Sequence, residues 1–179
     1  MTIITTTRLI LRAFASTDAD DLHAYLSEPS IYQFESGEPI DLHQARKMAR
    51  DLAASPDFWA VEHQATHRVI GQIHFKHIEP QHLQTWELGY ILNPHYHRQG
   101  YMSEAGAALV RHGFAHCAIH RVVAHCNPEN TASWKLLEKI GFQREGLLRQ
   151  NFFIRKDALG EPIWTDTYVY ALLASEAKC

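Results

Sequence analysis

The junction between a strand and a helix at residues 86–105 constrains the fold of this chain more than any other feature. The strand pattern ends at Leu92 because Asn93 and Pro94 interrupt it. A polar stretch then leads through Gly100 to a helical pattern that begins at about Ser103. Such a junction presents unpaired backbone N–H groups at the positive end of a helix dipole, which suits an anion. A side chain at position 100 would block a phosphate from those amides, so the glycine fits this interpretation. Many strand-to-helix loops contain a glycine, and the junction alone is a weak signal.

The segments around this junction predict one mixed α/β domain. Short turns separate the strands that precede it, which is typical of an antiparallel meander. The expected strands lie within Arg8–Phe14, at Phe58–Glu62, Val69–Ile78, Thr85–Leu92 and Arg121–Cys126, and twice within Phe142–Leu173. The expected helices begin after Ser16, span about Leu42–Ala54 and Ser103–His116, and run from Asn130 or Thr131 to Lys139. We therefore expect a mixed, mostly antiparallel seven-stranded sheet flanked by about four helices, in a single domain over residues 1–179.

Composition excludes several classes of protein. The 179 residues suffice for one domain with a core, and 17 basic against 20 acidic residues leave no excess that would favour nucleic acid as the main partner. No window approaches the roughly 18–20 apolar residues of a membrane helix, and the first ten residues lack the apolar run of a signal peptide. The three cysteines form no CxxC pair, which indicates a reduced compartment. We expect a cytoplasmic protein, monomeric or homodimeric, without a membrane partner.

Three stretches of the sequence together carry a family resemblance. Glu87–Tyr90, Asn93–Pro94 and Gly100–Ala105 match the wording E-L-G-Y…N-P…G-x-G-Y-A-T-E-A. The second stretch, NPENTAS at 127–133 with LEK at 137–139 and GF at 141–142, matches N-x-x-N-x-x-S…L-E-K-x-G-F, and the third is the opening RLILR at 8–12. The chain resembles the GNAT superfamily of N-acetyltransferases, and most of all the branch that includes the ribosomal-protein N-terminal acetyltransferases. The resemblance covers nearly the whole chain and is densest between Trp86 and Gly146.

The resemblance implies that acetyl-CoA is the donor cosubstrate and that the acetyl group moves directly to a primary amine. By analogy with the family, Ile91 and Leu92 flank the pantetheine arm, amides from Arg98 to Ser103 hold the pyrophosphate, and Asn130 hydrogen-bonds the pantetheine region. The expected donor-binding residues are Ile91, Leu92, His97, Arg98, Gln99, Gly100, Tyr101, Met102, Ser103, Asn130 and Ser133. His97, Arg98 and Met102 depart from the residues that the family prefers.

Two residues are expected to act in catalysis. The resemblance implies that Ser133 protonates the leaving thiolate, and its position one helical turn beyond Asn130 lets both side chains meet one ligand. Glu87 is the candidate general base, although a polar residue on a half-exposed strand face is the alternative. A base contributes roughly 10²–10⁴-fold, and an α-amine with pKa about 7.7–8.0 needs it less than a lysine at about 10.4. Some ribosomal-protein-acetylating relatives have a glutamate near the last strands, where residues 150–153 contain no acid.

The identity of the acceptor, the role of one loop and the alternative of a protein without catalytic activity stay open at this point. Protein N-terminus, lysine, polyamine and antibiotic amine are all compatible with the sequence, and the loop Glu28–Ile40 either lines the acceptor cleft or simply covers the core. A catalytically silent acyl-CoA-binding module is the runner-up. His112, His116 and His120 are spaced by four, but surface histidines and no metal are expected. Cys117 and Cys126 show no activating context, so we expect no acyl-enzyme.

Overall fold

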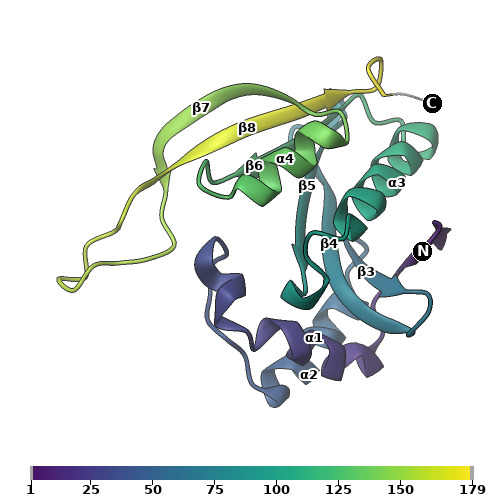
Figure 1. The fold of residues 1–179 in the computed structure, drawn as a ribbon. Coiled ribbons are helices and arrows are strands. Elements are labelled where there is room, and N and C mark those ends of the chain that lie inside the picture. The colour runs from purple at the N-terminus through teal and green to yellow at the C-terminus, as the bar shows by residue number, and fades with distance from the viewer. Residues whose placement is uncertain (1, 178–179) are drawn as a thin grey trace.

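An open β-sheet runs through the computed structural model, which describes residues 2–177 (Figure 1). Within the described residues its strands follow the spatial order β1-β2-β3-β4-β5-β6-β8-β7. The strands are β1 (Ile4–Thr5), β2 (Leu9–Arg12), β3 (Phe58–His63), β4 (Arg68–Ile78), β5 (Thr85–Leu92), β6 (Arg121–Cys126), β7 (Gln143–Phe152) and β8 (Thr165–Leu173). The helices are α1 (Ala19–Leu26), α2 (Leu42–Ala53), α3 (Tyr101–His116) and α4 (Thr131–Lys139), with short 3₁₀ turns at η1 (Ser16–Asp18), η2 (Pro29–Gln33), η3 (Gln81–Leu83) and η4 (Pro94–Tyr96).

The predicted α/β class, the mixed sheet and the four helices are confirmed, but the predicted number of strands is wrong. The described residues contain eight strands rather than seven, because Ile4 and Thr5 pair antiparallel with Leu11 and Ile10. A strand of two residues is too short to show an alternating pattern in the sequence. The two late strands lie within Phe142–Leu173, as expected.

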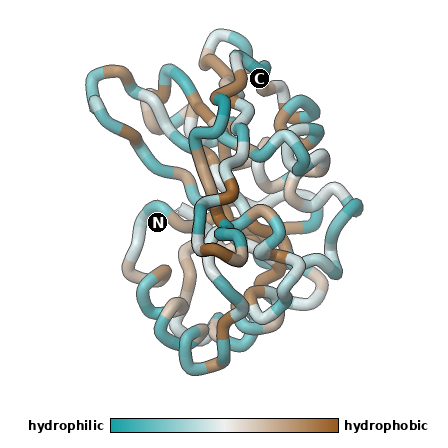
Figure 2. The backbone as a smooth tube through the Cα atoms, turned by 90° about the vertical axis from the view of Figure 1, so that its left-hand side faces the viewer, coloured by the Kyte–Doolittle hydropathy of each residue, from teal (hydrophilic) through white to brown (hydrophobic). Residues whose placement is uncertain are grey.

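Alternation along the strands builds a core on each face of the sheet. Trp59 and Val61 of β3 pack in the cluster that contains buried residues of α3 and α4, whereas Ala60 between them packs with α1 and α2. The hydrophobic segments accordingly gather along the strands in the middle of the molecule (Figure 2). None of the helices within residues 2–177 combines the length and the apolar character needed to cross a membrane.

The neighbouring strands β5 and β6 diverge halfway along their length. They run parallel and are paired at Thr85–Arg121, Trp86–Val122 and Glu87–Val123, whereas β5 continues to Leu92 and pairs there with β4 alone. From Leu88 onward, the side of β5 that faces β6 therefore has backbone groups that the sheet does not use. This divergence opens the sheet at one end.

The opening motif anchors the sheet to the helices. Arg8 donates from its backbone N and its Nε to the carboxylate of Glu104 in α3, at 2.9 and 2.7 Å, and Thr6 Oγ1 donates to the same carboxylate at 2.6 Å. Arg12 donates to Asp18 at 2.8 and 2.9 Å and to Glu62 at 2.6 Å. Glu104, which suits the first turn of a helix by charge alone, thus also joins α3 to the start of the chain.

Candidate active site

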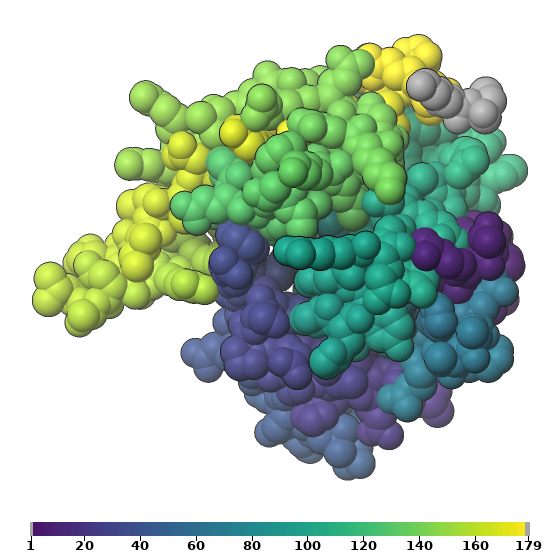
Figure 3. Space-filling view, in the orientation of Figure 1, coloured from purple at the N-terminus to yellow at the C-terminus, as the bar shows by residue number. Residues whose placement is uncertain are grey.

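A cavity of about 620 Å³ lies where β5 and β6 diverge. Strands β4, β5 and β6, helix α4, the segment after η2 and the β7–β8 hairpin all contribute to its walls. The space-filling view shows a hollow between the segment after η2 and the strands and helix α4 above it (Figure 3). Segments far apart in the sequence therefore share one site.

Tyr90 and Ser133 form a hydroxyl pair in this cavity. Asn130 caps α4 and its Oδ1 accepts a hydrogen bond from Ser133 N at 3.1 Å, which fixes the first turn of the helix. Ser133 Oγ then lies 2.9 Å from Tyr90 Oη on β5. Burial raises the pKa of Tyr90 well above its usual value, so the phenol keeps its proton at neutral pH. The pair can donate a hydrogen bond to a group that develops negative charge.

Glu87 lies in the same cavity with His125 beside it on β6. His125 Nδ1 is 3.1 Å from Glu87 Oε1, and this hydrogen bond is the largest cause that lowers the pKa of Glu87. Lys76 on β4 pairs with Glu87 across the sheet and lowers that pKa further. Glu87 is therefore a carboxylate at neutral pH, as a proton acceptor must be.

The loop before α3 has unpaired amides at the positions where the sequence predicts an anion site. Gly100 caps the helix with φ +80°, and the first backbone bond of the helix runs from Glu104 N to Gly100 O at 3.0 Å. The amides of residues 101–103 precede that bond and are the ones a helix leaves without internal partners. A Cβ built on Gly100 would meet only Arg8 Nη2, at 3.6 Å, so the space in front of the loop is open.

The predicted donor-binding residues divide into three groups. Ile91, Asn130 and Ser133 line the first cavity, and Gln99, Gly100 and Ser103 line a second hollow of about 910 Å³. The remaining five, Leu92, His97, Arg98, Tyr101 and Met102, line neither of the two.

The departures from the family pattern leave the loop clear. His97 Nε2 bonds to Leu92 O at 2.9 Å, and Gln99 Nε2 donates to His95 O at 3.2 Å, so both side chains hold the loop itself. Met102 is buried in the core with 3% of its surface exposed. Only its backbone amide can therefore meet a ligand. Basic and acidic side chains are equally numerous on the walls of the second hollow, so the fit to a diphosphate rests on the backbone amides at the start of α3 and not on net charge.

Several residues that the sequence did not assign to the site also line the first cavity, among them Glu35, Tyr90, His125 and Asp166. Asp166 on β8 accepts a hydrogen bond from Gln150 N at 2.8 Å, so an acid does approach the region around residue 150, from the neighbouring strand. The aromatic residues of the loop 28–40 were the only sequence signal near Glu35.

The described cysteines and the histidines of α3 are the remaining candidates for chemistry. Burial raises the pKa of the Cys126 thiol to about 11, which leaves it protonated and unreactive, and Cys117 is exposed. Cys179 lies outside the described residues. His112 and His116 lie 4.6 Å apart by ring centroids, yet within residues 2–177 no three histidine, cysteine or carboxylate side chains gather as metal ligands would.

Comparison with known proteins identifies the family. The sequence profile of the acetyltransferase (GNAT) domain matches residues 8–143. The uncharacterized N-acetyltransferase YnaD of Bacillus subtilis (strain 168) is 31% identical over 174 residues, covering 97% of this chain and 98% of its own length. A crystal structure of a GNAT-family acetyltransferase from Bacillus anthracis superimposes with a TM-score of 0.87 at 30% identity, over 98% of this chain and all of that one.

The chain belongs to the GNAT family and is an N-acetyltransferase that uses acetyl-CoA. Its relatives include the [ribosomal protein uS5]-alanine N-acetyltransferase of Escherichia coli (strain K12), which is 26% identical over 187 aligned positions, covering 90% of this chain and 92% of that protein.

Proposed function

We propose that this enzyme transfers the acetyl group directly from acetyl-CoA to the α-amine of a protein N-terminus. The observation that carries the proposal is the content of the first cavity. The divergence of β5 from β6 brings an ionised carboxylate, Glu87, and a protonated hydroxyl pair, Tyr90 and Ser133, into one space. A transfer between two bound substrates needs both a proton acceptor and a donor to the leaving group.

The residues that would hold the donor substrate lie along the same opening. Backbone groups of β5 beyond Leu88 have no partner on β6 and are available to the pantetheine arm. The side-chain N–H₂ of Asn130 stays available because only its oxygen caps the helix. Amides at the start of α3 suit the diphosphate. No acyl-enzyme is needed, and the protonated Cys126 makes a poor nucleophile.

The proposed reaction balances with the release of one proton. The acceptor amine enters as its ammonium form and loses one proton before it attacks the thioester carbonyl carbon. As the new C–N bond forms and the C–S bond breaks, the electron pair passes to sulfur and the nitrogen gives its second proton to Glu87, directly or through water. Ser133 donates a hydrogen bond to the departing sulfur, with Tyr90 holding it in place, and the thiolate is protonated to the thiol.

Two features favour a protein N-terminus over a lysine or a small amine. A relative that aligns with almost the whole chain is, by its name, a [ribosomal protein uS5]-alanine N-acetyltransferase. The β7–β8 hairpin, which forms part of the cavity wall, also carries apolar side chains that are about half exposed, among them Leu148 and Phe152. Such a surface suits the side chains that follow an N-terminal residue.

Mass spectrometry of acceptors after incubation with acetyl-CoA tests this proposal. The panel pairs peptides with a free N-terminal alanine or serine against N-terminally blocked peptides that contain lysine, and adds a polyamine and an aminoglycoside. We expect the acetyl group on the α-nitrogen, and little product with the Ser133→Ala variant. Product on the small amines alone would refute the proposed acceptor. Binding of coenzyme A without turnover of any amine would favour the silent acyl-CoA-binding module instead.

A further inference from the structure

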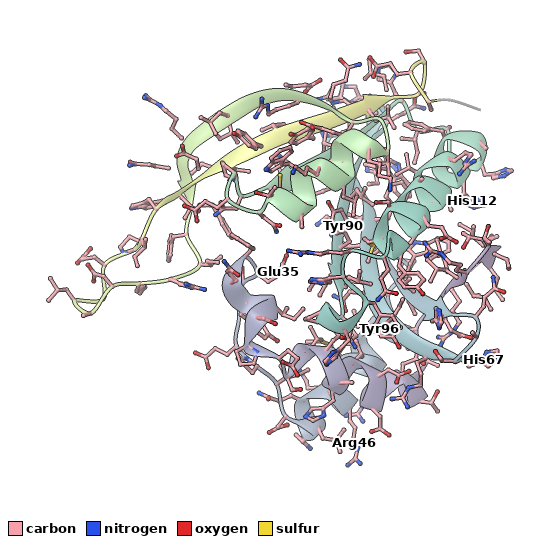
Figure 4. All side chains as sticks on the ribbon, viewed as in Figure 1. Glu35, Arg46, His67, Tyr90, Tyr96 and His112 are labelled. Atoms are coloured by element: carbon pink, nitrogen blue, oxygen red, sulfur yellow. The ribbon has the colours of Figure 1, made fainter. Side chains whose placement is uncertain are left out.

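Glu35 holds a carboxylate that the fold leaves without a partner. It follows η2, it is half-buried, and it lines the first cavity. Figure 4 shows it on the segment that faces the opening, across from the strand that carries Tyr90. Within residues 2–177 it takes part in no side-chain hydrogen bond and no ion pair with a basic residue. A half-buried carboxylate is costly unless a cation or a donor meets it.

A basic side chain reaches this segment but bonds to its backbone. Arg155, from the β7–β8 hairpin, donates from Nη2 to the backbone oxygens of Tyr32 and Gln33, at 3.4 and 3.5 Å. No lysine or arginine is among the described residues that line the cavity, whereas Glu35, Glu87 and Asp166 are. The cavity is thus built to receive positive charge from outside the protein.

We propose that Glu35 binds the ammonium group of the acceptor and takes the first proton from it. This inference rests on the acetyltransferase function proposed above and deepens it. The N–H bond of the ammonium breaks, its electron pair stays on nitrogen, and the proton passes to the Glu35 carboxylate. The neutral amine then attacks the thioester, and Glu87 takes the second proton. Glu35 therefore accepts a proton before the attack, and Glu87 accepts one during it.

The acidity of Glu35 supports a weakly basic amine as the acceptor. Burial raises the pKa of Glu35 to about 7. An α-ammonium group, with pKa about 7.7–8.0, gives its proton to such a carboxylate with a disadvantage of roughly tenfold, whereas a lysine ammonium at about 10.4 meets a disadvantage of more than about a thousandfold. This difference favours an α-amine, or another primary amine of similar basicity, over a lysine.

The test compares Glu35→Gln with Glu38→Gln. Gln keeps the shape and removes the charge, and Glu38 is an exposed acid three residues along that does not line the cavity. Two measurements are made at neutral pH: the affinity of the coenzyme A-loaded protein for an alanyl peptide by calorimetry, and kcat and KM for each amine that the wild type acetylates. We expect Glu35→Gln to weaken peptide binding and raise KM by at least about tenfold, with coenzyme A affinity unchanged. Glu38→Gln should match the wild type.

The pH profile provides a second readout that a structural role would not change. The ammonium and Glu35 must carry one proton between them, so wild-type kcat/KM should pass through a maximum between about pH 7 and 8. Glu35→Gln binds the neutral amine instead, and its profile should rise and level off. Other titratable or charged groups face this space: Glu87 and Tyr90 on β5, His74 on β4, His125 on β6, Asp166 on β8, and Arg155 on the hairpin. A maximum that persists in Glu35→Gln would belong to one of these groups and would refute the proposal.

The outcomes separate this inference from the proposed function. If the wild type acetylates only small amines, the N-terminal acceptor is wrong, but a loss of affinity for those amines in Glu35→Gln still supports the role of Glu35. If peptides are acetylated equally well by both variants and the wild type, the acceptor stands and the role of Glu35 is refuted. If no amine on the panel binds to the coenzyme A-loaded wild type, both fail.

Discussion

Replacing Gly100 with valine tests the diphosphate cradle with a magnitude that the structure supplies. Gly100 has φ +80°, a conformation that costs other residues roughly 1–2 kcal/mol, and a β-branched residue more. A Cβ there meets only Arg8 Nη2, at 3.6 Å, so Gly100→Val should fold. The strain lowers Tm by about 2–8 °C for a chain of this length. If the backbone relaxes to relieve that strain, the N–H groups at the start of α3 change direction. The valine side chain also enters the space proposed for phosphate.

The expected result is a loss of coenzyme A affinity of at least about tenfold, measured by isothermal calorimetry, since about 1.4 kcal/mol corresponds to tenfold. Gly160→Val is the matched control. Gly160 also has a positive φ, +86°, and nothing within 4 Å of its Cβ, but it lies at the tip of the β7–β8 hairpin. It should lose similar stability and bind coenzyme A normally. Equal coenzyme A affinity in the two variants would show that the diphosphate lies elsewhere.

Three further outcomes follow from contacts described above. Ser133→Ala should lower kcat by about 10–100-fold with acetyl-CoA affinity changed by less than about threefold, and a larger change in affinity than in kcat would contradict its role at the leaving group. Cys126→Ala should keep turnover within a few-fold, and intact-protein mass spectrometry with acetyl-CoA alone should find no acetylated enzyme; a trapped acyl-enzyme would refute direct transfer. Arg12→Met should cost about 2–4 kcal/mol in urea unfolding, because the buried carboxylate of Asp18 loses its ion-pair partner and that of Glu62 keeps His67 but loses the arginine. Burial alone would raise the pKa of Glu62, but hydrogen bonds from Arg12 and His67 lower it overall, so this stabilisation is present above about pH 4.3 and lost as the pH falls; a variant with the same acid sensitivity as wild type would contradict this.

Residues with a local pattern were predictable from the sequence. Gly100, Asn130 and Ser133 owe their positions to a helix start, which a few neighbouring residues determine, and the structure has caps at both places. The alternation of β3 to β6 likewise follows from burial on alternate faces. The spacing of these residues does not indicate what they bind, and the family resemblance supplied those expected roles.

The rest depends on contacts between distant segments. Glu35 belongs to the site only because the loop after α1 folds back to the opening between β5 and β6. His125 meets Glu87, and Asp166 meets Gln150, through strand neighbours that the sequence does not specify locally. Tyr90 ends a stretch that matches the family pattern, but nothing in the sequence indicates that its hydroxyl contacts Ser133 from another element. The two-residue strand β1 was not predicted, because it is defined by its pairing with β2 and is too short to show a periodic pattern.

The short parallel pairing between β5 and β6 divides the groups of the active site between two sides of the sheet. On one side stand Glu87 and Tyr90, on the other Cys126 and the helix that carries Ser133. One continuous core packs against both strands, and the bonds Tyr90–Ser133 and Glu87–His125 also cross between them. A change in that core can alter the reaction by shifting one strand relative to the other, without touching any atom that meets a substrate.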